Sequence, residues 1–147
     1  MSQQNDYIER WNRASIPFAQ FLGFTLERIG DGESELHFTA RPEHLNTHGV
    51  THGGASMTLM DVTMAAAARS VDFEMGVVTI EMKTSFMRPA NGKLVARGKL
   101  LHRTRSMAFV EATILDEGGA ACAHATGTFK YVQRRLPATA GDGISTD

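Results

Sequence analysis

Two features eight residues apart in the sequence have the residue types needed for chemistry on a carbonyl group. The first is the glycine pair Gly53-Gly54, which stands where a long apolar segment begins. The second is Asp61, the only acidic residue of that segment. Carbonyl chemistry needs a donor for the oxygen that gains negative charge, and a base or nucleophile for the carbon. These two positions could supply both.

The glycine pair suits the donor role if the apolar segment is a helix. The first turn of a helix has backbone N–H groups without partners inside the helix, and the helix dipole adds partial positive charge there. Because Gly53 has no Cβ, a ligand oxygen can approach its N–H closely. The same pair could also serve only as a tight turn into the helix, and by itself it does not decide between the two roles.

Asp61 is the sharper signal. Met57, Thr58, Met64 and Ala65 flank it at three and four residues, so it would lie on a largely apolar helix. A buried carboxylate is costly unless it is paired or neutral. Desolvation would raise its pKa toward the range useful for a general base. The alternative is a structural aspartate that is hydrogen-bonded to a backbone or hydroxyl group.

Helix geometry separates the two groups. Eight residues span about 12 Å along a helix, so one substrate carbonyl cannot reach both Gly53 and Asp61 of the same chain. If both act on one substrate, Asp61 must come from a neighbouring subunit. The chemistry therefore predicts at least a homodimer, with two sites at its interface.

The remaining sequence predicts the elements that position these residues. Alternation and turn residues indicate an α+β fold, with an antiparallel sheet that covers one buried helix. One helix cannot cover both edges of the sheet, so the free edge invites a second copy. We expect one domain over 1–136 and a disordered tail from Pro137. The expected helices are an N-terminal helix over 5–20, broken or kinked at Pro17, and the buried helix over 53–70. The expected strands are 24–29, 34–40, 76–87, 93–104, 107–116 and 120–132.

Composition narrows the class of protein. The 147 residues suit one domain, and the apolar and charged contents of 42% and 21% are ordinary for a globular protein. A formal net charge of −1 disfavours nucleic acid and anionic membranes as partners. One cysteine, Cys122, excludes an internal disulfide, and the sequence has neither a signal peptide pattern nor a membrane-length apolar run. We expect a cytoplasmic location.

At this point the sequence resembles a known family. Asn46, His52-Gly53-Gly54, Leu59, Asp61 and Met87-Arg88-Pro89-Ala90 are similar to the motifs of PaaI-type hotdog thioesterases, within the 4-hydroxybenzoyl-CoA thioesterase-like superfamily. The resemblance covers roughly residues 20–132. It implies a long helix wrapped by an antiparallel sheet, paired into a dimer and often into a tetramer that is a dimer of dimers.

The resemblance also implies a reaction: hydrolysis of acyl-CoA thioesters with phenylacetyl, related aryl or medium-chain acyl groups. No metal or separate cofactor is implied, since coenzyme A is part of the substrate. Gly53 would donate its N–H to the thioester oxygen, Asn46 and His52 would position the thioester or water, and Asp61 of the partner subunit would attack or activate water. Thr79 would orient that water. We further expect four residues to contact the substrate: Gly54, Met57, Arg88 and Pro89.

Other interpretations remain open. A dehydratase or hydratase of the same fold would pair His52 with Asp61, and a non-catalytic acyl-CoA binding module would need no buried carboxylate. His44, His48 and His52 have a spacing that could bind zinc on a helix. A helix there is disfavoured by Asn46, Gly49, Val50, Thr51 and Gly53. Ser56 lacks the second glycine of a nucleophile elbow. Cys122 is predicted to be a core side chain.

Overall fold

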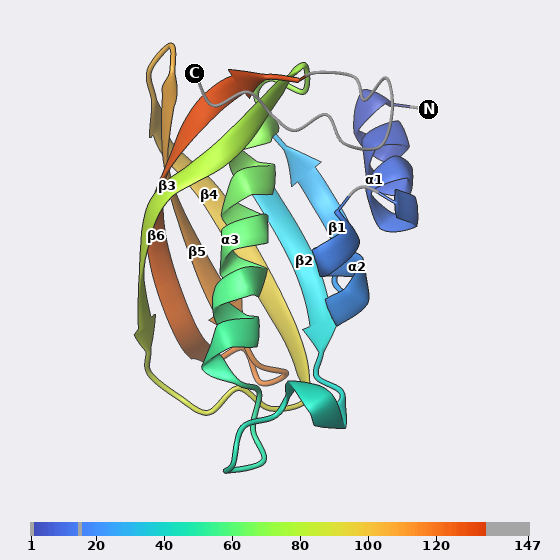
Figure 1. Cartoon of the computed structure of the whole chain (residues 1–147), viewed down its shortest axis with the longest axis vertical. Helices are drawn as coiled ribbons and strands as arrows, with labels where there is room; N and C mark the ends of the chain where they lie inside the picture. Colours follow the sequence, from blue (N-terminus) through green and yellow to red (C-terminus); the bar gives the residue numbers. More distant parts are fainter. Residues whose placement is uncertain (1, 15, 135–147) are drawn as a thin grey trace.

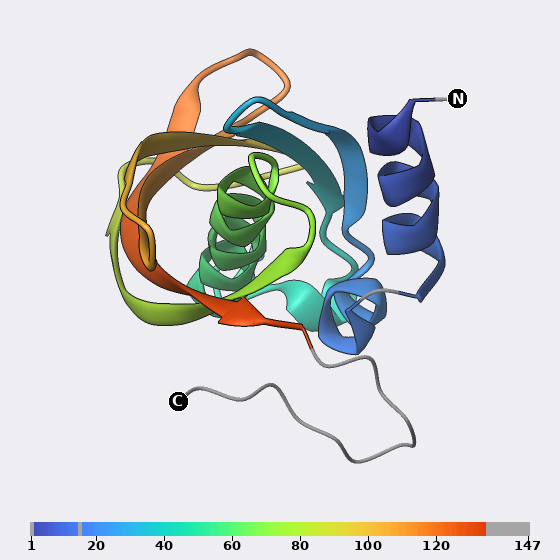
Figure 2. The ribbon, with the colours of Figure 1, turned by 90° about the horizontal axis from the view of Figure 1, so that it is seen from above.

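The computed structural model describes residues 2–14 and 16–134. One six-stranded antiparallel sheet curls around a single long helix, with strand order β1-β2-β4-β5-β6-β3 (Figures 1 and 2). In chain order the elements are α1 (Gln3–Ala14), α2 (Pro17–Leu22), β1 (Thr25–Gly30), β2 (Glu33–Thr39), the 3-10 turn η1 (Pro42–His44), α3 (Gly53–Arg69), β3 (Met75–Phe86), β4 (Lys93–Arg103), β5 (Met107–Leu115) and β6 (Ala121–Gln133).

This architecture confirms the predicted fold class and nearly every predicted element. Near the N-terminus, the segment expected to be one helix over 5–20, broken or kinked at Pro17, is broken and forms two helices, α1 and α2. Pro17 is the first residue of α2, where its missing N–H costs nothing and its fixed φ favours helix initiation. The predicted disordered tail from Pro137 lies outside the described residues. Among the described residues, no helix is both long and apolar enough to cross a membrane.

The core forms where α3 lies in the hollow of the sheet. Figure 2 shows the sheet curving around the helix when the molecule is seen from above. Leu59, Met60 and Met64 are fully buried on the sheet-facing side of α3, and the helix contacts every strand. The apolar pattern of the segment therefore serves to fill the hollow, as expected for a helix that is hydrophobic nearly all round.

The sheet has two edges, and residues of the described chain cover only one of them. Strand β1 is flanked by α1, and the Asn12 side chain lies against its edge like a short piece of strand. Asn12 Nδ2 donates to the Leu26 carbonyl at 2.9 Å, and Asn12 Oδ1 accepts from the Leu26 N–H at 2.8 Å. At the other edge, the 12-residue strand β3 pairs with β6 alone among the described residues. A long uncovered edge of this kind is available for pairing with another chain.

Gly98 marks a close approach of α3 to the sheet. A Cβ at this position would lie 2.6 Å from Ser34 Oγ and 2.8 Å from the Thr63 carbonyl oxygen. Those two atoms are themselves hydrogen-bonded at 2.7 Å, so β2, β4 and α3 meet here. No side chain fits without moving the helix.

We therefore predict that Gly98→Ala lowers the free energy of unfolding by about 2–3 kcal/mol, the usual cost of overpacking a core. Gly118→Ala is the matched control, because its Cβ would meet only the Asp116 side chain at 3.4 Å; we expect a change within about 0.5 kcal/mol. Urea unfolding of both variants measures the difference. Equal stability of the two variants would contradict the close packing.

Candidate active site

Asp61 lies on the side of α3 that the sheet does not cover. It is half-buried, whereas its neighbours Met60 and Thr63 on the sheet-facing side are fully buried. Thr79, from the edge strand β3, donates its hydroxyl hydrogen to Asp61 Oδ1 over 2.7 Å. The contact joins the helix to the uncovered edge of the sheet and holds the carboxylate in one orientation.

The surroundings of Asp61 change its acidity. Burial raises the pKa of the Asp61 carboxyl above its ordinary value near 3.8, and the hydrogen bond from Thr79 lowers this pKa in part. The two effects oppose each other because burial penalises the charged form, whereas a donor stabilises it. A carboxylate with a raised pKa is a better base than an ordinary aspartate.

Gly53 is the first residue of α3 and opens into a second region. Its N–H has no partner inside the helix, and no other acceptor takes it among the described residues. His52 is the N-cap residue, and its Nδ1 accepts the N–H of Gly54 at 2.8 Å. The arrangement uses the Gly54 amide to fix the helix start and leaves the Gly53 amide available to a ligand.

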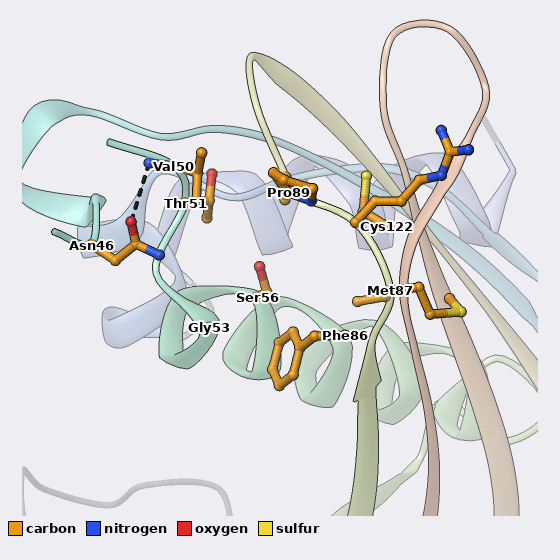
Figure 3. Close-up of a pocket in the computed structure, with 12 residues that line it drawn as sticks. Asn46, Val50, Thr51, Gly53, Ser56, Phe86, Met87, Pro89 and Cys122 are labelled. Carbon is orange, nitrogen blue, oxygen red and sulfur yellow. Dashed lines mark hydrogen bonds between the residues drawn. The ribbon is translucent and has the colours of Figure 1, made fainter. Parts of the chain in front are cut away.

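Asn46 holds the loop that precedes α3. Its Oδ1 accepts the backbone N–H groups of His48 at 2.9 Å and Val50 at 3.2 Å, and Figure 3 shows the second of these bonds. Because two N–H donors fix the position of the amide oxygen, the Nδ2 group turns away from the loop. In Figure 3 this nitrogen lies on the side toward Gly53, so Asn46 can donate to a group bound beside that glycine.

Gly53 and Asn46 line the same pocket, which has a volume of about 360 Å³. Arg88 and Pro89, predicted to contact the substrate, also line it. Sequence reasoning gave no ligand-binding role to Thr51, Ser56 or Cys122, which share this pocket, because a single hydroxyl or thiol carries no periodic signal. The full lining is Asn46, Val50, Thr51, Gly53, Ser56, Phe86, Met87, Arg88, Pro89, Ala90, Cys122 and Ala123 (Figure 3); we call it the polar pocket.

Asp61 lines a different pocket, of about 340 Å³. Met57, another predicted substrate contact, is beside it one helical turn earlier. Gly54 lines neither of these two pockets. The structure thus places Gly53 and Asp61 in separate hollows at different levels of α3. Gly53 and Asp61 of one chain therefore do not share a pocket, in agreement with the distance along the helix.

The side chains of the three loop histidines lie in different environments. His44 is buried and packs against Phe38 with ring centroids 5.4 Å apart, while His48 is exposed and His52 caps the helix. Within residues 2–14 and 16–134, no group of three or more His, Cys, Asp or Glu side chains has a geometry that could hold a metal ion. Cys122 is fully buried, in agreement with the prediction for that residue.

Comparison with known proteins identifies the family. The model of the thioesterase superfamily matches residues 48–123, which include the HGG turn, Asp61 and Thr79. The chain belongs to this superfamily and has its hotdog fold. Thioester hydrolysis is the general activity that this membership supports, and the chain is a hydrolase on that basis.

Individual relatives agree with this assignment. A conserved protein of Pseudomonas aeruginosa is 32% identical, with a TM-score of 0.77 over 80% of this chain and 95% of its own. The phenylacetic acid degradation protein PaaI of Thermus thermophilus, solved as a mutant, is 26% identical, with a TM-score of 0.72 over 78% of this chain and 98% of its own. A protein of Saccharolobus solfataricus named "Putative esterase" is 28% identical and covers 89% of this chain and 94% of its own.

The hydrogen bond between Thr79 and Asp61 generates a prediction that needs no substrate. Thr79→Val keeps the shape of the side chain and removes the donor, so the pKa of Asp61 should rise further above its ordinary value. Thr79→Ser is the control, because it retains the hydroxyl group. NMR titration of the Asp61 carboxyl carbon measures the pKa in each variant. An unchanged or lower pKa in Thr79→Val would show that the bond does not stabilise the carboxylate.

Proposed function

We propose that the chain hydrolyses acyl-CoA thioesters, with phenylacetyl, related aryl or medium-chain acyl groups, at sites shared between two subunits. The observation that carries this proposal is the division of the machinery. The available amide of Gly53 and the carboxylate of Asp61 lie in different pockets of one chain, so a complete site needs a second copy. The substrate supplies its own coenzyme A, and the reaction requires no metal or redox cofactor.

The chemistry follows from the two half-sites. The Gly53 N–H and Asn46 Nδ2 of one subunit donate to the thioester oxygen as it gains negative charge. Asp61 of the partner subunit attacks the carbon or takes a proton from the attacking water. Thr79 of that same subunit donates a hydrogen bond to Asp61 Oδ1 and so holds the carboxylate in place. If Asp61 acts as a base, the water oxygen bonds to the carbon, the carbon–sulfur bond breaks, and the proton taken from water passes to the leaving thiolate. If Asp61 attacks directly, the carbon–sulfur bond breaks to leave a mixed anhydride; water then cleaves this anhydride, which releases the acid, regenerates the carboxylate and supplies the proton for the thiolate. The raised pKa of Asp61 suits either role of the carboxylate.

The uncovered edge of β3 provides the means of pairing. Antiparallel association of two β3 strands would continue the sheet from one subunit to the next and satisfy the free backbone groups of both edges. Thr79 lies on this strand beside Asp61, so the same association brings the uncovered sides of two α3 helices toward each other. We propose a homodimer as the minimal active unit and a homotetramer as its further assembly.

A hydration reaction would instead need His52 as the partner of Asp61. His52 Nδ1 is engaged with the Gly54 N–H at the start of α3, which gives the imidazole a structural role. No other observation favours hydration, and hydrolysis remains the proposed reaction.

The oxyanion role of Gly53 can be tested with a substitution that removes its backbone N–H donor. Gly53→Pro deletes the N–H at a helix position where proline is favoured, and His52 already has the extended backbone, with ψ of 137°, that a following proline requires. We expect kcat/KM for phenylacetyl-CoA and octanoyl-CoA to fall about 10²- to 10³-fold, the usual loss for one oxyanion donor. Release of free thiol measures the rate.

Gly53→Ala is the matched control, because it keeps the N–H and adds the same Cβ. That Cβ would meet the Phe86 ring at 3.3 Å, and more than half of the surface of this ring is exposed, so it can move. Most of the activity should remain. A loss in Gly53→Ala as large as that in Gly53→Pro would assign the effect to the side chain and contradict the donor role.

Subunit sharing can be tested by complementation. Asp61→Asn and Gly53→Pro should each be nearly inactive as pure proteins. When the two variants are co-expressed in equal amounts, half of the dimers are mixed, and each mixed dimer has one intact site, which restores about a quarter of the wild-type activity. If both residues acted within one chain, co-expression would restore nothing. Sedimentation of each variant confirms that the dimer persists.

A further inference from the structure

The pocket that contains Asp61 is an apolar groove between α2 and α3. Its lining has two polar side chains, Thr58 and Asp61 itself, and otherwise consists of Ile16, Phe18, Ala19, Met57, Val62 and Met82. Figures 1 and 2 show α2 lying next to α3 outside the hollow of the sheet, and the two helices are in contact. We call the groove between α2 and α3 the acyl groove. Its outer wall, α2, precedes the residues that match the family.

The polar pocket at Gly53 has more hydrogen-bonding side chains in its lining than the acyl groove has. Thr51 is 5% exposed, and its buried Oγ1 has no hydrogen-bond partner among the described residues. Ser56, also buried, points its hydroxyl into the same pocket (Figure 3). A buried polar atom without a partner is costly unless a ligand or water satisfies it. With Asn46 and Arg88 also present, this pocket offers more hydrogen-bonding groups than the acyl groove does, which suits a ligand segment that carries amide groups or phosphates.

The two halves of an acyl-CoA molecule differ in the same way. The arm that ends in sulfur carries amides and leads to phosphates, whereas the acyl group is hydrocarbon. We infer that the thiol arm lies in the polar pocket of the subunit that supplies Gly53, and that the acyl group lies in the acyl groove of the subunit that supplies Asp61. This inference rests on the proposed function and adds to it that α2 selects uncharged, apolar acyl groups by their length.

Phe18 and Phe21 offer a matched pair for the test. Both are aromatic residues of the six-residue helix α2, and both are largely exposed, at 57% and 68%. Phe18 lines the acyl groove and Phe21 does not. Neither side chain belongs to the core, so replacement by alanine should leave the fold intact.

The experiment measures kcat/KM for acetyl-, butyryl-, hexanoyl- and octanoyl-CoA in the wild type, Phe18→Ala and Phe21→Ala. In the wild type we expect kcat/KM to rise with length, by up to about fourfold for each methylene that becomes buried in the groove. In Phe18→Ala this dependence should be flatter, so that the loss relative to wild type grows with chain length and is about tenfold larger for octanoyl-CoA than for acetyl-CoA. Phe21→Ala should follow the wild-type dependence.

A second comparison tests the charge of the acyl group. Succinyl-CoA resembles pentanoyl-CoA in size but ends in a carboxylate, which the apolar groove would have to desolvate near the Asp61 carboxylate. We expect kcat/KM for succinyl-CoA to be at least about a hundredfold lower than for pentanoyl-CoA.

Several outcomes would overturn the inference. A loss in Phe18→Ala that is the same for every chain length would show an effect on the site or the dimer as a whole. An equal length-dependent loss in Phe21→Ala would show that the groove lining is irrelevant, and comparable rates with succinyl-CoA and pentanoyl-CoA would exclude an apolar groove as the acyl site. In each of these cases hydrolysis itself stands. If the wild type releases no thiol from any acyl-CoA, the proposed function fails instead.

Discussion

A curved sheet around a single helix leaves one strip of that helix uncovered, and this constraint governs the arrangement of the whole molecule. The Asn12 side chain of α1 covers the β1 edge, so the uncovered strip of α3 lies beside the one remaining strand edge, β3. Asp61 lies on this strip and Thr79 on that strand, joined by a hydrogen bond of 2.7 Å. The Asp61 carboxylate is therefore held beside the strand edge, β3, that the described residues leave uncovered.

The rise of the helix separates the two chemical functions. The start of α3 provides an unpaired amide with partial positive charge, and it cannot provide a carboxylate without cancelling that charge. Asp61 lies about two turns further along, so it cannot meet the same carbonyl within one chain. The proposed association of two copies would resolve this conflict, because each subunit could offer the start of its own helix to the middle of the other.

The two pockets show how the environment of each half-site matches its role. Near Gly53, the buried Thr51 hydroxyl provides hydrogen-bonding capacity that no other described residue uses, and the Ser56 side chain lines the same pocket. Near Asp61 the lining is apolar, which raises the pKa of the carboxyl, and the hydroxyl group of Thr79 limits that rise. The same apolar surface that raises the pKa of the carboxyl is well suited to a hydrocarbon group, so one surface would account for both the acidity of Asp61 and the proposed substrate preference.

The sequence alone determined the local elements, the single buried helix, Gly53 and Asp61, and the separation of these two residues. Each follows from short-range patterns: alternation in the strands, a glycine pair before an apolar run, and the fixed rise of a helix. Only the tertiary structure decided that β3 pairs with β6 at the sheet edge, that Asn12 covers the opposite edge, and that α2, after the break at Pro17, forms a wall beside Asp61. These contacts join residues that are distant along the chain. They are stabilised by packing and hydrogen bonds between segments, and a pattern over a few neighbouring residues does not show which distant segments pair.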